Sequence, residues 1–182
     1  MEKINAKYVF LDVVSYTNRD IEAQSTIVEV LQKIVKDAID DFDELDTWWN
    51  ENVNFLPTGD GMCIVMENID DPEDIHVQVG LKILSKLEKY NNEAQPSERF
   101  ELRIGINENK DIVYTDINGR RNYAGRGINY AQRVMSFANK GQIFVGSIVY
   151  EKLADTRSYK NRFIERKVTL KNNQQILIYE YR

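Results

Sequence analysis

Two acidic residues interrupt stretches that are otherwise apolar. Asp12 lies within YVFLDVV, residues 8–14, and Asp60 lies between two glycines in FLPTGDGMCIV, residues 55–65. An unpaired carboxylate is costly to bury, so Asp12 needs a hydrogen-bond partner, a cation, or a position where its strand leaves the core. The PTGDG segment is typical of a tight hairpin turn that displays Asp60 at its tip. Both acids are therefore candidates for chemistry.

The two carboxylates converge if the first strand and the hairpin are neighbours in one sheet. Two close acids without an obvious basic partner are a natural site for Mg²⁺ or Mn²⁺, because these ions prefer oxygen ligands. Asp60 alone is also explained by ordinary Gly-Asp-Gly turn chemistry. Asp12 alone is also explained by a buried acid that accepts backbone hydrogen bonds. The two acids together favour the metal site.

A third group of polar residues lies in NYAGRGINYAQRVMSFA, residues 122–138. Asn129 and Arg133 are four residues apart, so in a helix they project from one face and can contact one ligand. The guanidinium of arginine can bind a phosphate through several donors, and an asparagine can orient a sugar oxygen. The alternative for this segment alone is a solvated arginine and an asparagine near a helix start.

Composition restricts the class of protein. The 182 residues, 42% hydrophobic and 29% charged, predict one soluble globular domain over residues 1–182. A net charge of −5 argues against a general nucleic-acid or membrane-surface binder. The single cysteine and single histidine leave no disulfide framework, no zinc spacing and little room for histidine-based catalysis. The apolar run near the N-terminus is too short for a signal or membrane span, so we expect a cytoplasmic location.

Apolar periodicity predicts the elements that position these residues. We expect strands at residues 8–14, 53–56, 62–66, 100–106, 112–117, 141–147, 163–170 and 175–181, and helices at 18–42, 71–91, 128–139 and 147–153. Asn18 is the expected N-cap of the first helix, and Pro72 suits the first turn of the second. The strands at 100–106 and 112–117 are expected to pair with each other, followed by a polar loop. This order predicts an α+β fold with a ferredoxin-like βαββαβ core and a C-terminal extension.

Five motifs in register resemble those of class III nucleotidyl cyclases. They are FLDVVSYT (10–17), TGDG (58–61), LRIGIN (102–107), GRGINYAQRV with GQIFVGS (125–134 and 141–147), and LKNNQQILIYEY (170–181). The resemblance runs in order from Tyr8 to Tyr181. It departs from the family pattern at Asn107, where the family has histidine, and in having no glycine shortly after Ile106.

The resemblance implies a two-metal mechanism. Asp12 and Asp60 would bind two divalent ions, Mg²⁺ or Mn²⁺, with help from the backbone carbonyl of Val13. The ions would draw the 3′-hydroxyl of a nucleoside triphosphate toward its α-phosphate and neutralise charge on the pyrophosphate. Asn129 would position the ribose, and Arg133 would stabilise the transition state at the α-phosphate.

The resemblance also implies phosphate-binding residues and a dimer. Lys171, and with less support Arg103, would hold the terminal phosphates. In the family, the catalytic groups come from two subunits of a head-to-tail dimer. This chain carries both sets, so a homodimer with two equivalent sites is expected.

The residues that read the base depart from the purine cyclases. Those enzymes usually carry a lysine or glutamate at the position of Leu56, and an aspartate or cysteine at the position of Asn122. Leucine cannot hydrogen-bond a base, and matched polar pairs carry selectivity, so a different base is suggested. Asn54, on the same strand face as Leu56, and Asn122 could each offer a hydrogen bond. A smaller base would need bulk from the pocket walls, with Phe55, Leu56, Trp48 and Trp49 as candidates.

A short cyclase domain with the purine-reading pair replaced resembles the pyrimidine cyclases of bacterial Pycsar anti-phage systems. Those enzymes make cyclic UMP or cyclic CMP, which activates a separate effector. The resemblance implies such a cyclase, with UTP slightly favoured over CTP. Three alternatives stay open. The chain is an adenylate or guanylate cyclase with an atypical pocket, a degenerate nucleotide-binding cyclase domain, or a ferredoxin-like interaction module without a ligand.

Overall fold

A computed structural model describes residues 2–43, 49–170 and 173–182. Eight strands in this part of the chain form one sheet of order β2-β3-β1-β4-β6-β8-β7, with β5 paired to β4. The strands are β1 (Glu2–Val13), β2 (Val53–Pro57), β3 (Gly61–Glu67), β4 (Leu102–Thr115), β5 (Arg121–Ala124), β6 (Ile143–Val145), β7 (Phe163–Thr169) and β8 (Gln175–Tyr181). The helices are α1 (Ile21–Asp43), α2 (Trp49–Asn52), α3 (Ile75–Glu93), α4 (Arg126–Met135) and α5 (Ser147–Leu153), after a 3-10 turn at Tyr16–Asn18.

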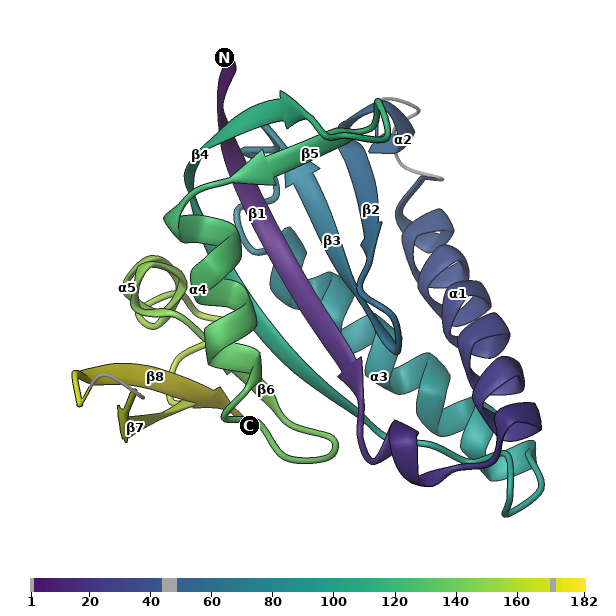
Figure 1. The fold of residues 1–182 in the computed structure, drawn as a ribbon. Helices are drawn as coiled ribbons and strands as arrows, with labels where there is room; N and C mark the ends of the chain where they lie inside the picture. Colours follow the sequence, from purple (N-terminus) through teal and green to yellow (C-terminus); the bar gives the residue numbers. More distant parts are fainter. Residues whose placement is uncertain (1, 44–48, 171–172) are drawn as a thin grey trace.

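The order of the first elements confirms the predicted α+β fold. Along the chain, β1, α1, β2, β3, α3 and β4 build an antiparallel sheet of order β2-β3-β1-β4, which is the ferredoxin-like arrangement. The C-terminal extension adds β6 parallel to β4, and the β7–β8 hairpin continues the sheet beyond it. Helices α1 and α3 cover one face of the sheet, and α4 lies on the other (Figure 1).

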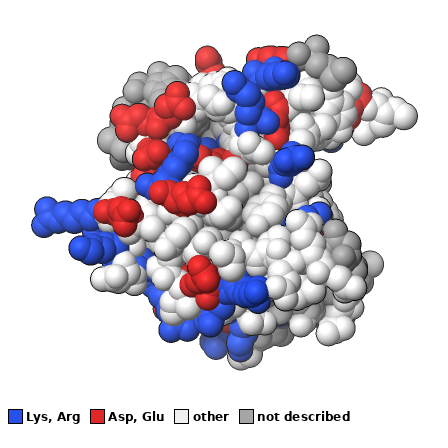
Figure 2. Space-filling model, turned by 90° about the vertical axis from the view of Figure 1, so that its left-hand side faces the viewer, with Lys and Arg blue, Asp and Glu red and all other residues white. Residues whose placement is uncertain are grey.

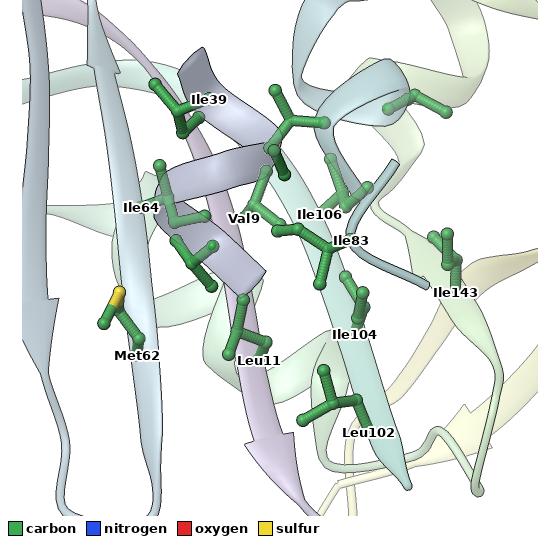
Figure 3. Close-up of a cluster of buried hydrophobic side chains, with 14 of the residues drawn as sticks. Val9, Leu11, Ile39, Met62, Ile64, Ile83, Leu102, Ile104, Ile106 and Ile143 are labelled. Carbon is green, nitrogen blue, oxygen red and sulfur yellow. The ribbon is translucent and has the colours of Figure 1, made fainter. Parts of the chain in front are cut away.

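Alternating side chains give the sheet two apolar faces. Val9 and Leu11 of β1 point toward α1 and α3, where Ile64, Ile83 and other buried aliphatic residues form the main core (Figure 3). The intervening residues of β1 point the other way and pack with Ala131 and Met135 of α4 in a second cluster. In the described part of the chain, no helix is both long and apolar enough to cross a membrane.

The predicted pairing of strands 100–106 and 112–117 with each other is wrong. They are parts of one strand, β4, which pairs with β1 over its length from Glu2 opposite Val113 to Val13 opposite Leu102. The polar segment NENKD, residues 107–111, lies between the two predicted strands and lacks the glycine that a family turn would use. Its buried side chains find polar partners on α4 and α5, which lets the strand continue.

Strand β5 and several element ends also differ from the predictions. The expected polar loop after residue 117 contains β5, which pairs with the end of β4. Helix α1 begins after Asp20, whose Oδ1 accepts a hydrogen bond from the backbone N–H of Ala23, so Asp20 replaces Asn18 as the capping side chain. Helix α3 begins three residues after Pro72, at Ile75, and α4 begins and ends earlier than expected.

Candidate active site

The hairpin between β2 and β3 brings Asp60 to the end of β1. Asp12 lies opposite Gly61 in the β1–β3 pairing, and the backbone N–H of Val13 donates to the carbonyl of Asp60 at 3.2 Å. A Cβ on Gly61 would lie 2.3 Å from the carbonyl oxygen of Leu11, so only glycine permits this close approach. The structure therefore confirms that the strand carrying Asp12 and the turn carrying Asp60 are neighbours.

The other glycine of the turn has a conformational role. Gly59 has a φ of 94°, in the region that residues with a side chain rarely adopt. In the sequence Gly-Asp-Gly, Gly59 thus allows the turn and Gly61 allows close contact with the backbone of β1. Asp60 lies between them, beside Asp12. Val13, the residue expected to offer its carbonyl to a metal, is the last residue of β1 and is buried.

Arg103 of β4 lies opposite Asp12 of β1 and binds its carboxylate. The Nε and Nη2 atoms of Arg103 lie 2.8 Å and 2.7 Å from Oδ2 of Asp12. Burial raises the pKa of Asp12 and the charge of Asp60 adds to that effect, while Arg103 opposes it. Within the described residues, the carboxylate of Asp60 makes no hydrogen bond or ion pair. This corner of the sheet therefore carries one cationic side chain, Arg103, and two acidic side chains, Asp12 and Asp60.

The donor set at this corner fits Mg²⁺ or Mn²⁺. The described residues contain no cluster of three acidic, histidine or cysteine side chains that would form a closed metal site. Mg²⁺ is usually held by one or two carboxylates together with waters and substrate phosphates. Asp12 and Asp60 supply two carboxylates, and the unpartnered side chain of Asp60 is available to a cation. The residues present therefore suit ions that complete their coordination on a triphosphate.

Asn129 and Arg133 lie on the exposed face of α4, as predicted. They line a cleft of about 700 Å³ between α4 and the end of β7. The other lining residues are Gln132, Met135, Ser136, Phe137, Thr169 and Leu170. Neither Asp12 nor Asp60 lines this cleft, so the structure does not bring the two groups together within one chain. Lys171, which follows Leu170, lies outside the described residues.

Leu56 belongs to the apolar cluster on the α4 side of the sheet. It lies opposite Cys63 in the β2–β3 pairing and packs against the cluster that contains Cys63, Val65 and Tyr123. A purine edge placed there would meet carbon and sulfur atoms instead of a matched donor and acceptor. The structure thus places an apolar surface at the position where purine cyclases use a polar side chain.

Asn54 and Asn122 are both engaged within the protein. The Nδ2 of Asn54 donates to Oε1 of Glu67 at 2.9 Å, and Oδ1 of Asn122 accepts the backbone N–H of Tyr123 at 2.8 Å. Glu67 also accepts hydrogen bonds from Nε of Arg121 at 2.6 Å and from the hydroxyl of Tyr123. Arg121 and Tyr123 lie on β5, where the sequence predicts a polar loop, so their shared face is not expected from the sequence. Alternation along a predicted strand would have placed them together.

Of the aromatic residues proposed for the pocket walls, only Phe55 has a described side chain, and it does not lie beside Leu56. Phe55 points to the opposite side of β2, where it lines a groove with Val35 and Ile39 of α1. Trp48 and the side chain of Trp49 lie outside the described residues. The aromatic residues of the cluster that Leu56 packs against are Tyr8, Phe10 and Tyr123.

Comparison with known proteins establishes the family. The model of the adenylate and guanylate cyclase catalytic domain matches residues 2–180. The chain belongs to this family, and its domain is a nucleotidyl cyclase catalytic domain. No match was found among curated protein sequences.

Solved structures agree with this assignment at the level of the fold. The guanylate cyclase domain of RhGC from Catenaria anguillulae, crystallised with GTP, is 19% identical with a TM-score of 0.72, covering 100% of this chain and 98% of that one. The adenylate/guanylate cyclase/hydrolase from Silicibacter pomeroyi is 19% identical with a TM-score of 0.71, at 100% and 98% coverage. The adenylyl cyclase CyaB from P. aeruginosa is 16% identical with a TM-score of 0.65, at 100% and 95% coverage.

The visible charge distribution agrees with a small anionic substrate better than with a polyanion. On the face that carries α5 and the β7–β8 hairpin, acidic and basic side chains are interleaved (Figure 2). A nucleic-acid interface would need a continuous basic surface there. The cations at the candidate site are instead few and local, with Arg103 at the paired acids and Arg133 on α4.

Proposed function

We propose that residues 1–182 form a single catalytic domain that converts UTP, in preference to CTP, into the 3′,5′-cyclic nucleotide and pyrophosphate. The observation that carries this proposal is the convergence of Asp12 and Asp60 in a fold of the cyclase family. In the reaction, the 3′-oxygen forms a bond to the α-phosphorus, the bond to the pyrophosphate oxygen breaks, and the hydroxyl proton passes to water.

The residues of the chain position the substrate for this displacement. Asp12 and Asp60 would hold two Mg²⁺ or Mn²⁺ ions, which would supply positive charge at the 3′-hydroxyl and at the leaving pyrophosphate. Asn129 orients the ribose, and Arg133 places its guanidinium at the α-phosphate, where negative charge develops. Such a mechanism relies on positioning and electrostatics, which suits a chain with one histidine.

Arg103 and Lys171 are proposed to hold the terminal phosphates. Arg103 binds Asp12 in the structure, so its phosphate role requires that a metal ion takes its place on that carboxylate. A divalent ion beside Asp12 and Asp60 would supply more positive charge than the single guanidinium that it displaces. Arg103 would then have its donors free for the terminal phosphates of the substrate.

A head-to-tail homodimer is proposed because one chain keeps the two groups of site residues apart. Asp12 and Asp60 lie at the β1–β3 corner, while Asn129 and Arg133 line the cleft beside β7. Two chains related by a two-fold axis can place the acids of one against the α4 cleft of the other. Two equivalent sites then follow from the symmetry.

The surroundings of Leu56 support a pyrimidine substrate. Leu56 offers no hydrogen bond, and Tyr123 occupies space in the same cluster. Asn54 and Asn122 remain the proposed base-reading residues, although each must exchange its present hydrogen bond for one to the base. A site with so few polar groups would discriminate poorly between adenine and guanine.

Product identification tests the proposal directly. The purified protein is incubated with equimolar ATP, GTP, CTP and UTP and with Mn²⁺, and the cyclic products are separated and identified by mass spectrometry. Cyclic UMP as the main product is the expected result, with cyclic CMP second. Cyclic AMP or cyclic GMP as the main product would support the purine alternative. No product from any triphosphate would support the degenerate domain.

On the basis of the resemblance to Pycsar cyclases, we also propose that the protein acts in anti-phage defence. Its cyclic nucleotide product would activate a separate effector. We expect the cyclic pyrimidine nucleotide to rise in cells that express the chain and are infected with phage. Cells that express the chain with Asp60→Asn serve as the control. Equal nucleotide levels in the two strains after infection would contradict this role without touching the activity measured in vitro.

A further inference from the structure

A row of polar residues on β4 lies beneath the first turn of α4. Asn107, Asn109 and Asp111 alternate along the strand and so face the same side of the sheet. Asp111 is 2% exposed, which is rare for an acid and indicates that its charge is satisfied by close partners. The proposed reaction gives it no role.

Asp111 binds the N-terminal end of α4 through two backbone groups. The N–H of Gly127 donates to Oδ1 at 3.1 Å, and the N–H of Ile128 donates to Oδ2 at 3.0 Å. The first N–H groups of a helix have no partner within the helix, and here no side chain of the N-cap residue, Gly125, supplies one. A carboxylate from another element therefore caps α4.

Tyr8 of β1 fixes this carboxylate from below. Its hydroxyl donates to Oδ2 of Asp111 at 2.8 Å, and its side chain is fully buried. Burial and the neighbouring Asp111 raise the pKa of Tyr8, so the hydroxyl keeps the proton it donates. A Cβ on Gly127 would lie 2.6 Å from Cε2 of Tyr8 and 2.7 Å from Oδ2 of Asp111. The helix therefore contacts both side chains directly.

A second contact fixes the other end of α4 on the same strand. A Cβ on Gly105 would lie 2.3 Å from the backbone nitrogen of Met135 and 2.4 Å from the carbonyl oxygen of Ala131, so the helix backbone rests on β4 there. Asn129 and Arg133 lie between the two contacts. Their positions consequently depend on where Asp111 holds the first turn.

We propose that Asp111, held by Tyr8, is a positioning residue for the cyclase reaction. It sets the position of α4 along β4, and with it the position of Asn129 and Arg133 at the nucleotide. The inference rests on the proposed roles of those two residues. A displacement of catalytic groups by about 1 Å can lower a rate on the order of 100-fold.

The test compares Asp111→Asn with Asp20→Asn. Asp111 accepts three hydrogen bonds, so an amide at this position must turn its NH₂ toward at least one donor. Asp20 caps α1, which carries no proposed site residue. We expect Asp111→Asn to lower kcat by tenfold or more with a smaller change in KM, measured well below the melting temperature of each variant. Asp20→Asn should keep the wild-type kcat.

Tyr8→Phe provides a variant that keeps both backbone hydrogen bonds of Asp111. It should lower kcat by a few-fold, and hydrogen exchange at Gly127 and Ile128 should accelerate. Wild-type kcat in Tyr8→Phe, or in a folded Asp111→Asn, would overturn the proposal. If Asp111→Asn does not fold, Tyr8→Phe alone decides.

The same measurements distinguish failure of the proposed function from failure of the positioning role of Asp111. A wild-type protein that forms no cyclic product from any triphosphate would overturn the cyclase assignment, and the catalytic consequence of Asp111 with it. A wild-type protein that is active, beside variants that are equally active, would overturn only the positioning role. The base that is cyclised does not affect the comparison.

Discussion

At the scale of single residues, the proposed chemistry depends on the paired acids Asp12 and Asp60. The carboxylate of Asp60 has no partner among the described side chains and adds to the raised pKa of Asp12. Its proposed role is therefore separable from the stability of the fold, since its removal breaks no hydrogen bond or ion pair within the described residues.

Asp60→Asn is expected to abolish activity without unfolding the protein. Loss of a metal ligand should lower product formation by about 100-fold or more, because the ions supply the transition-state charge. The melting temperature without metal should stay the same or rise, since a like charge beside Asp12 is removed. The measurement is product formation with saturating Mn²⁺ together with a thermal melt. The exposed Asp37 of α1, changed to Asn, is the matched control, and wild-type activity in Asp60→Asn would refute the metal assignment.

The single histidine predicts a pH dependence of stability. His76 is 1% exposed, and its Nε2 lies 3.6 Å from Oε2 of Glu108. Burial, followed by the charge of Lys7, lowers its pKa in the folded protein. A lowered folded pKa means that the unfolded chain binds the proton more tightly. Stability is thus full above the unfolded value of about 6.5 and falls as the pH drops below it.

We expect the free energy of unfolding to decrease between pH 7 and pH 5, by up to about 1.4 kcal/mol per pH unit from this group. His76→Leu should remove this part of the slope, because leucine fills a similar volume and does not titrate. Chemical denaturation at several pH values measures both proteins. The same slope in the variant would show that other groups cause it.

At the scale of elements, the sequence predicted the order of strands and helices and the placement of Asp12, Asp60, Asn129 and Arg133. Apolar periodicity was sufficient there because each of these residues ends a strand, forms a turn or lies on a helix face. It failed from Asn107 to Tyr123. The sequence of that region, taken alone, is typical of a turn and a loop. In the structure it forms a strand, because Asp111 and its neighbours find polar partners on α4.

The network of Glu67, Arg121 and Tyr123 was missed for the same reason. A buried acid at the end of β3 has no predictable partner when the strand that supplies the partner, β5, is not identified. Local patterns report which side chains share a face, but they do not report which distant element covers it. The base-side residues were accordingly the least predictable part of the site.

The contact of α4 with Gly105 predicts that a methyl group added at this glycine strongly lowers the stability of the fold. Gly105→Ala should lower the free energy of unfolding by about 1–3 kcal/mol, because backbone atoms of α4 must move. Gly80→Ala in α3 is the control, since its new methyl would meet side-chain atoms and no backbone atoms among its nearest neighbours, the closest being Cδ1 of Ile106 at 3.1 Å. Chemical denaturation compares the two, and equal costs would contradict a rigid contact between α4 and β4.

At the scale of the whole molecule, the proposed dimer predicts complementation between two inactive variants. Asp60→Asn loses the acid group, and Arg133→Ala loses the α4 group. In a mixed dimer one site carries both changes and the other carries neither. Random exchange should restore about a quarter of the wild-type activity, because half of the dimers are mixed and each has one intact site.

The measurement is product formation after the two variants are unfolded and refolded together. Each variant refolded alone is the control and should remain inactive. Sedimentation of the wild-type protein should show a dimer at the same concentration. Mixtures no more active than the separate variants would indicate that each site is built from one chain.

The unbroken length of β4 has a consequence for how such an enzyme is switched. One strand carries Arg103 at the paired acids, Gly105 beneath α4 and Asp111 at the start of that helix. Because β4 is hydrogen-bonded to β1 along its length, it holds the two proposed groups of site residues at a fixed spacing within one chain. In the proposed dimer, a signal that opens or closes the site would therefore turn one subunit against the other, and inhibitors that bind between the subunits should outperform those that deform a single subunit.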